Sequence, residues 1–153
     1  MDQRRQGEIE KILQYVVDAS TVVKWVLSGE PYKENSARLK QDYLAGTINL
    51  SAPSIAVQEV ANSLWKARTR GRILQEDAQE ALKILQGMRI ELHEFNWIEI
   101  SEALNIACKL NLAIYDSTYL LLSEKLKAQL VTADDQLYQK AKEHFKLLHI
   151  KNY

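Results

Sequence analysis

Short apolar runs alternate with longer amphipathic stretches along most of the chain. β-Branched and aromatic residues cluster in short runs, which predict strands at residues 15–17, 48–50, 90–95, 129–132 and 147–150. Apolar residues at helical spacing predict helices after residue 20 and over residues 32–45, 53–71, 75–86, 97–110, 116–126 and 135–145. This alternation indicates an α/β fold with a mostly parallel central sheet of about four to five strands and helices on both faces.

The chain before the first strand has a different character. Residues 1–14 are rich in charge, and Ile9, Ile12 and Leu13 lie at helical spacing, which predicts a short amphipathic helix over residues 8–14. After it, the sequence contains neither an internal repeat nor a linker long enough to separate two domains. The expected organisation is an N-terminal lead-in helix within residues 1–14 and a single domain over residues 15–153.

Four acidic residues stand where a predicted strand gives way to a helix, or just inside that helix. They are Asp18, Glu59, Asp116 and Asp134. The carboxyl ends of parallel strands line one rim of a sheet, so acids from distant segments are brought together there. Because like charges repel, such a cluster needs protons or a cation to neutralise it. Mg²⁺ and Mn²⁺ prefer oxygen ligands, so all four acids are candidate ligands, with Asp18 and Asp116 as the inner pair.

A divalent metal at such a rim indicates chemistry on phosphate. Phosphodiester hydrolysis needs an activated water, shielding of the charged phosphate and stabilisation of the leaving oxygen, and bound metal ions supply all of these. Ser20 and Thr132 are candidate supports that orient a carboxylate or a metal-bound water. Taken singly, an aspartate at a helix start is ordinarily a cap, and Glu59 alone is ordinarily a solvated residue. The hypothesis therefore depends on the four acids acting together.

Basic residues follow Glu59 on the same helix and into the next turn. These candidate contacts for nucleic-acid phosphates are Lys66, Arg68, Arg70 and Arg72. Cations beside an acidic metal site suit the phosphates of a single strand. The alternative is a solvated helix end whose cations complement the helix dipole.

Aromatic, histidine and cysteine residues add less. Trp25, Trp65 and Trp97 fall beside apolar helical positions, so core or dimer packing is expected of them rather than base stacking. Cys108 lies on an apolar helix face and is expected to be buried. The histidines, at positions 93, 144 and 149, form no spacing that suits zinc or a nucleophilic triad.

Composition limits the class of protein. Hydrophobic residues make up 46% and charged residues 26% of the chain, which is ordinary for a globular domain. Basic and acidic residues balance at 20 each, so any attraction for nucleic acid is local. A single cysteine excludes an internal disulfide and fits a reducing cytoplasm. The N-terminus has no apolar core of signal-peptide length, and the apolar stretches are too short to span a bilayer. A cytoplasmic protein with no membrane partner is expected.

Four short motifs occur along the chain in an order and spacing that are typical of a known family. They are VDAS at residues 17–20, Pro53 followed by EVANSLW at 59–65, YDSTYL at 115–120 and LVTAD at 130–134. In this order they resemble the PIN-domain ribonucleases, and within them the VapC-type toxins of toxin–antitoxin pairs. The resemblance covers residue 15 to the C-terminus, and the lead-in before residue 15 departs from it because such toxins usually begin close to their first strand.

The resemblance implies a PIN-like fold and an RNA endonuclease that depends on Mg²⁺ or Mn²⁺. It further implies Asp18, Glu59, Asp116 and Asp134 as the catalytic acids, a homodimer, and inhibition by a cognate VapB-type antitoxin. Two alternatives stay open. One is a non-catalytic PIN-fold module that binds RNA or protein, and the other is a receiver-like phosphoacceptor domain, which also gathers acids at the end of a parallel sheet.

Overall fold

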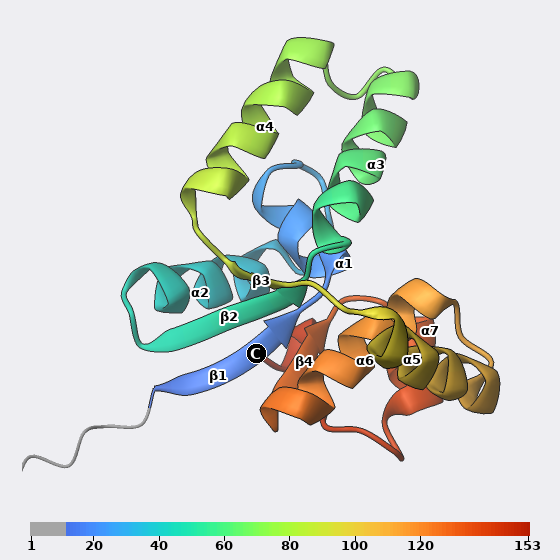
Figure 1. The fold of residues 1–153 in the computed structure, drawn as a ribbon. Helices are drawn as coiled ribbons and strands as arrows, with labels where there is room; N and C mark the ends of the chain where they lie inside the picture. The colour runs from blue at the N-terminus through green and yellow to red at the C-terminus, as the bar shows by residue number, and fades with distance from the viewer. Residues whose placement is uncertain (1–11) are drawn as a thin grey trace, which may run out of the picture.

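The computed structural model describes residues 12–153, which form a sheet with helices around it (Figure 1). The strands are β1 (Leu13–Val17), β2 (Ile48–Pro53), β3 (Glu91–His93), β4 (Gln129–Thr132) and β5 (Leu147–His149). The α-helices are α1 (Ala19–Val22), α2 (Lys33–Leu44), α3 (Ala56–Thr69), α4 (Gln75–Gly87), α5 (Trp97–Leu110), α6 (Ile114–Leu126) and α7 (Asp135–Ala141). Two short 3-10 helices, η1 (Val23–Trp25) and η2 (Ile150–Asn152), complete the described part.

The sheet has five strands in the order β3-β2-β1-β4-β5, and every neighbouring pair is parallel. The chain runs outward from β1 to β3 and then returns to the other side of β1 at β4. This reversal makes the carboxyl ends of β1 and β4 the place where an open α/β sheet forms a crevice. The predicted α/β fold with a parallel sheet and helices on both faces is confirmed.

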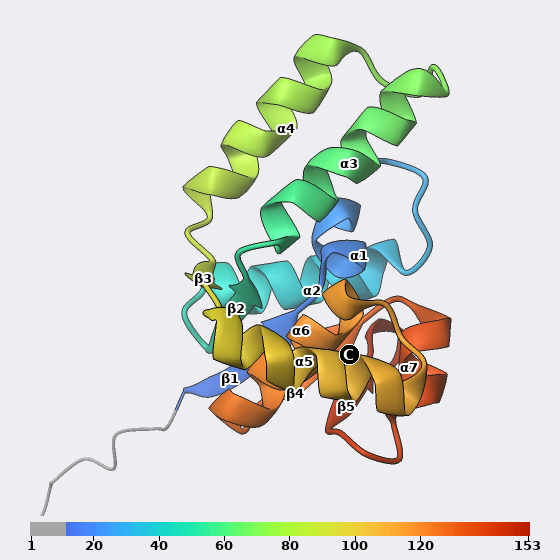
Figure 2. The same cartoon turned by 45° about the vertical axis from the view of Figure 1, so that its right-hand side comes forward.

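Helices cover the sheet on two sides. Helix α6 packs against β1, β2 and β4, and α5 packs on the outside of α6. Helix α2 contacts β2 from the other side of the sheet (Figures 1 and 2). The second half of strand β1 is enclosed, since Val16 and Val17 are 0% exposed, which explains the apolar run over residues 15–17.

Helix α6 has the longest continuous buried stretch among the helices of the described residues. All seven residues from 117 to 123 are buried, so the helix has no solvent face over two turns. A helix enclosed on every side lies between the sheet and another helix, which here is α5. Its first turn carries Asp116 out of this enclosure toward the rim of the sheet.

Helices α3 and α4 form a hairpin that projects away from the sheet (Figures 1 and 2). Gly71 ends α3 with a positive φ of 73°, a conformation that glycine adopts without strain. The base of α3 packs against α1, which fixes the end of the hairpin that carries Glu59.

Several predicted boundaries change. Pro53 ends β2 instead of opening a helix, and α3 begins at Ala56. Helix α7 ends at Ala141, short of the predicted residue 145, and the last strand passes into η2 after His149. The predicted lead-in helix falls mostly on residues outside the described part, and its last two residues instead begin β1.

No helix in residues 12–153 is long and apolar enough to cross a membrane.

Two burial predictions are wrong for the single chain. Cys108 is exposed because α5 meets its neighbours through the small buried residues Ala103 and Ala107. Core packing is likewise wrong for Trp65 and Trp97, which are 60% and 92% exposed.

Candidate active site at the carboxyl ends of β1 and β4

Two of the predicted acids come from neighbouring strands. Asp18 follows β1 directly, and its backbone N–H donates to the carbonyl of Val131 in β4 at 3.3 Å. Asp134 lies two residues beyond the end of β4. Parallel pairing of β1 with β4 therefore brings Asp18 and Asp134, the first and last of the four candidate acids, to the same rim.

Asp18 is the most enclosed of the four acids, with 4% of its surface exposed. Its Oδ1 accepts hydrogen bonds from Ser20 Oγ at 2.7 Å, from Thr21 N at 3.0 Å and from Thr21 Oγ1 at 3.0 Å. Its Oδ2 accepts a hydrogen bond from Thr132 Oγ1. Asp18 is itself the N-cap of α1, and Ser20 and Thr21 of the same helix donate hydrogen bonds to this cap.

The hydroxyl of Thr132 connects the first acid to the last. It donates to Asp18 and accepts from the backbone N–H of Asp134 at 3.0 Å. Ser20 makes a parallel link, because its Oγ donates to Asp18 and accepts from Ala133 N at 3.2 Å. Both predicted supporting hydroxyls therefore lie in one hydrogen-bond network with the carboxylate of Asp18.

Asp134 caps α7. Its Oδ1 accepts from the backbone N–H groups of Gln136 at 2.9 Å and Leu137 at 3.0 Å. The cap fixes the carboxylate at a helix N-terminus, where the macrodipole favours negative charge. The ordinary capping role and a role in a metal site are compatible here, since Oδ2 takes part in neither of these two bonds.

Glu59 lies in the first turn of α3 and has a partner that the sequence analysis did not identify. The phenol of Tyr119, a residue 1% exposed in α6, donates to Glu59 Oε1 at 3.0 Å. Tyr119 follows Asp116 by three positions, which places both on one helix face. That spacing is the signal in the sequence by which Tyr119 could have been identified.

The electrostatics show that the acids act on one another. Burial raises the pKa of Asp116 to about 6, and the nearby carboxylates of Asp134 and Asp18 add to the rise, while the ammonium of Lys140 opposes it. Burial also raises the pKa of Glu59; the Tyr119 hydrogen bond lowers it, and the charges of Asp116 and Asp18 raise it.

The pKa of Asp18 is also raised by burial, against the lowering effect of its hydrogen bonds from Thr132, Ser20 and Thr21. Carboxyl groups that raise one another's pKa gain from a nearby cation, which would favour their ionised forms. The four acids thus form one electrostatic unit at the rim, although they come from four separate segments.

The donor set suits a hard divalent cation, because it consists of carboxylates supported by hydroxyls. In the described residues, no three histidine, cysteine, aspartate or glutamate side chains converge closely enough to make a ready metal site. In particular, both carboxylate oxygens of Asp18 already accept hydrogen bonds from side chains of the same protein. Binding an ion would therefore require rotation of carboxylate side chains at the rim.

The four candidate RNA contacts divide into two groups. Lys66, Arg68 and Arg70 are exposed near the end of α3. Arg72 is instead engaged within the chain, where its Nη2 donates to the carbonyl of Ser28 at 2.9 Å and pairs with Glu30 at 3.3 Å.

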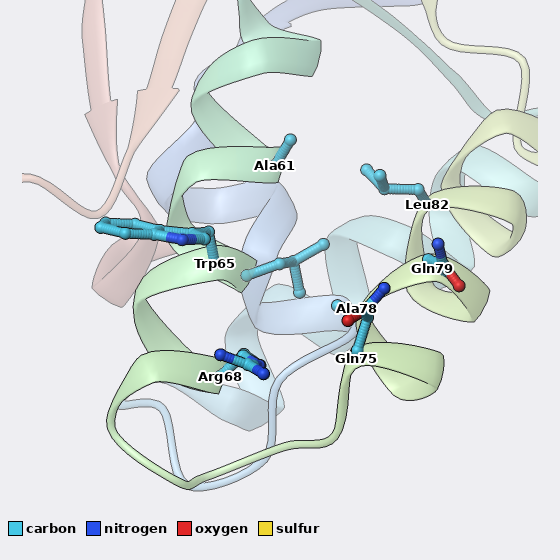
Figure 3. A pocket seen from close by; sticks show the side chains of 8 residues that line it. Ala61, Trp65, Arg68, Gln75, Ala78, Gln79 and Leu82 are labelled. Atoms are coloured by element: carbon cyan, nitrogen blue, oxygen red, sulfur yellow. The ribbon is translucent and has the colours of Figure 1, made fainter.

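The α3–α4 hairpin carries two cavities. The outer one, of about 350 Å³, is lined by Trp65 and Arg68 of α3 and by Gln75 and Gln79 of α4 (Figure 3). A second cavity of about 420 Å³ lies at the base of the hairpin and is lined mostly by apolar side chains, among them Val57 and Leu92. Leu82 lines both cavities.

Comparison with known proteins identifies the family. The family model of the PIN domain matches residues 15–143. Ribonuclease VapC3 of Pyrobaculum aerophilum is 30% identical over 129 residues, which cover 84% of this chain and 95% of that protein.

Solved structures share the fold. The crystal structure of PAE2754 from Pyrobaculum aerophilum matches with a TM-score of 0.68 at 24% identity, covering 91% of this chain and 92% of that one. VapBC2 of Rickettsia felis, solved with a DNA fragment from its promoter, matches with a TM-score of 0.61 at 19% identity, covering 89% of this chain and 98% of the other. The receiver-like alternative has no support among these matches. Since the family model spans most of the chain and the VapC3 match spans nearly all of that relative, the chain belongs to the PIN-domain family and is related to the VapC ribonucleases.

Proposed function

We propose that this protein is a VapC-type endoribonuclease toxin that depends on Mg²⁺ or Mn²⁺. The relationship to a protein named as a ribonuclease supports the reaction class. The observation that carries the metal dependence is the crowding of buried carboxylates at the rim: burial raises the pKa of Asp116 to about 6, and the charges of Asp134 and Asp18 add to the rise. Such a cluster stores repulsion that a bound cation would relieve.

The four acids would hold the ion, with Asp18 and Asp116 as inner ligands and Glu59 and Asp134 completing the site. When bound, a divalent ion supplies an activated water and shields the charge of the phosphate. The chain's own contribution is orientation. Thr132 and Ser20 hold the carboxylate of Asp18, and Tyr119 holds that of Glu59.

Proton binding competes with metal binding at this site. Because the pKa of Asp116 is raised to about 6, a fraction of the protein carries a proton there at neutral pH in the absence of metal. Metal binding would release this proton. Activity is therefore expected to increase as pH rises through about 6, toward full ionisation of Asp116.

RNA would approach along the α3 side of the rim. Lys66, Arg68 and Arg70 are exposed on the helix that carries Glu59, so their charges are available to phosphates. Arg72 is the weakest of the four candidates because it already pairs with Glu30. Replacing Arg68 and Arg70 with glutamine should raise KM and reduce the salt dependence of KM, with little change in kcat.

A VapB-type antitoxin is the proposed protein partner, in line with the VapBC2 complex that shares this fold. The cavity at the base of the hairpin is lined mostly by apolar side chains, which suits the binding of an apolar segment of such a partner. A second copy of the chain is the proposed oligomeric partner. Helix α5 exposes three large apolar side chains, Trp97, Ile98 and Leu104, at 92%, 74% and 54% of their surfaces. Self-association would cover this apolar patch. The proposed setting is the cytoplasm.

The test is cleavage of single-stranded RNA by the purified, antitoxin-free protein with Mn²⁺, Mg²⁺ or EDTA. Cleavage should need the metal and should fall by orders of magnitude in Asp116→Asn and Glu59→Gln. Glu124→Gln is the matched control, because Glu124 is an exposed acid on the same helix as Asp116. Activity that survives EDTA or survives Asp116→Asn contradicts the proposal.

A non-catalytic PIN-fold module that binds RNA or protein is the second candidate. The observation in its favour is that no ready metal site exists among residues 12–153. A protein that binds RNA without cleaving it, and that shows no Mn²⁺ binding by calorimetry, would establish the module instead of the nuclease.

A further inference from the structure

His149 is a buried polar side chain that the proposed mechanism does not use. It ends β5 and is 1% exposed. Its ring packs between the rings of Tyr32 and Tyr138, with centroid distances of 5.4 and 5.5 Å and nearly perpendicular planes. A polar group in such an enclosure destabilises the fold unless its hydrogen-bonding atoms are satisfied.

Both ring nitrogens of His149 have partners. The backbone N–H of Lys151 donates to Nδ1 at 3.1 Å, so Nδ1 is an acceptor and carries no proton. The proton is therefore assigned to Nε2, which donates to Asp135 Oδ1 at 2.7 Å. One nitrogen faces the C-terminal helix η2, and the other faces the first turn of α7.

The contact with Asp135 reaches the candidate active site. Asp135 is the first residue of α7 and follows Asp134 directly. In the sheet, His149 pairs with Thr132, the residue whose hydroxyl holds both Asp18 and Asp134. The N-terminus of α7 is thus fixed on one side by Thr132 in β4 and on the other by His149 in β5.

We propose that His149 is a positioning residue that acts through Asp135 to set the orientation of the first turn of α7, and with it the carboxylate of Asp134. This inference rests on the proposed function, because it assigns Asp134 a place in the metal site. Partners that orient ligand-bearing segments are commonly as important as the ligands, and their loss lowers metal affinity about 10- to 100-fold.

The competing explanation is a purely structural role, in which His149 caps η2 through Lys151 and fills space between two tyrosines. Two conservative variants separate the roles. In His149→Gln the amide nitrogen reaches roughly the position of Nε2 and keeps the bond to Asp135. In His149→Asn the amide oxygen lies near the position of Nδ1 and keeps the bond from Lys151, but the side chain is too short for Asp135.

The experiment measures Mn²⁺ affinity by calorimetry and, on the metal-free proteins, hydrogen exchange of the Gln136 and Leu137 amides, which the Asp134 cap protects. His149→Asn should bind Mn²⁺ about 10- to 100-fold more weakly and exchange these amides faster, whereas His149→Gln stays close to the wild type. Asp135→Ala should match His149→Asn without disturbing the core, since the Asp135 side chain is 81% exposed. Combining Asp135→Ala with His149→Asn should add no further loss.

Equal losses in the Gln and Asn variants overturn the inference, because the cap on η2 or the ring packing would then be responsible. Wild-type values in His149→Asn or in Asp135→Ala overturn it as well. A wild-type protein that neither binds Mn²⁺ nor cleaves RNA defeats the proposed function instead. In that case the exchange rates of the metal-free variants still decide whether His149 positions α7.

Discussion

The hydroxyl of Thr132 links two of the candidate acids through hydrogen bonds. It donates to the buried carboxylate of Asp18 and accepts from the backbone N–H of Asp134, and the residue itself is 0% exposed. Thr132→Val replaces the hydroxyl with a methyl group of similar size. The substitution therefore removes both hydrogen bonds while leaving the packing of β4 nearly unchanged.

The magnitude follows from the two bonds. A hydrogen bond to a charged group contributes about 1.5–3 kcal/mol and a neutral one about 1 kcal/mol, so Thr132→Val should lower the free energy of unfolding by roughly 2.5–4 kcal/mol. For a domain of this size the melting temperature should fall by about 5–15 °C. The loss should grow as pH rises, because removing this bond raises the folded-state pKa of Asp18 further and so weakens folding most where Asp18 must ionise.

Urea denaturation in EDTA, at mildly acidic and mildly alkaline pH, measures this loss. Thr21→Val is the matched control. Thr21 is also buried but supplies only one side-chain bond to Asp18, and its backbone N–H bond to the same oxygen remains. Its loss should be about 1.5–3 kcal/mol, roughly two thirds of that of Thr132→Val. A Thr132→Val protein within about 0.5 kcal/mol of the wild type, the usual range for surface substitutions, refutes the view that Thr132 holds the first and last acids together.

Three further predictions follow from the crowded carboxylates. Metal-free protein should lose stability as pH rises from about 4 through about 6, since the raised pKa of Asp116 means that the folded state binds this proton more tightly; a melting temperature that climbs steadily from pH 5 to pH 8 in EDTA contradicts this. Asp116→Asn should abolish cleavage yet stabilise the metal-free protein by about 1–1.5 kcal/mol at pH 8, half of the full electrostatic value because Asp116 is partly solvent-exposed; urea denaturation that shows a loss of stability is the opposing result. Tyr119→Phe, which removes the hydrogen-bond donor to Glu59, should weaken Mn²⁺ binding about 10-fold in calorimetric titration. An unchanged affinity would mean that this hydrogen bond does not contribute to metal binding.

Local pattern was enough to predict much of the fold. The predicted helix over residues 97–110 and strand over residues 129–132 match α5 and β4 at both ends. The sequence marks the start of α5 clearly, because Asn96 is a favourable N-cap residue. In the structure its side chain accepts a hydrogen bond from Glu99 N. Boundaries failed where local signals conflict with the sheet, as at Pro53, whose place at the end of β2 is set by pairing with β3.

The contents of the site were harder to predict than its location. Strand-to-helix junctions indicated the four acids, because the topology of a parallel sheet brings such junctions to one rim. Partners that depend on packing between distant elements left a weak signal or none. Tyr119 reaches Glu59 only because α6 lies beside α3, and His149 meets Asp135 only because β5 pairs with β4. Cys108 was misjudged for the same reason, since the face that α5 buries is decided by its contact with α6.

We propose above that carboxylates from four segments hold one hard divalent ion. Anomalous diffraction from a crystal soaked in Mn²⁺ tests it most directly. We expect a single strong peak at the carboxyl ends of β1 and β4, about 2.1 Å from oxygens of Asp18 and Asp116, and the loss of this peak in Asp116→Asn. A map without a peak among the four acids, or with manganese bound only elsewhere on the surface, would contradict it.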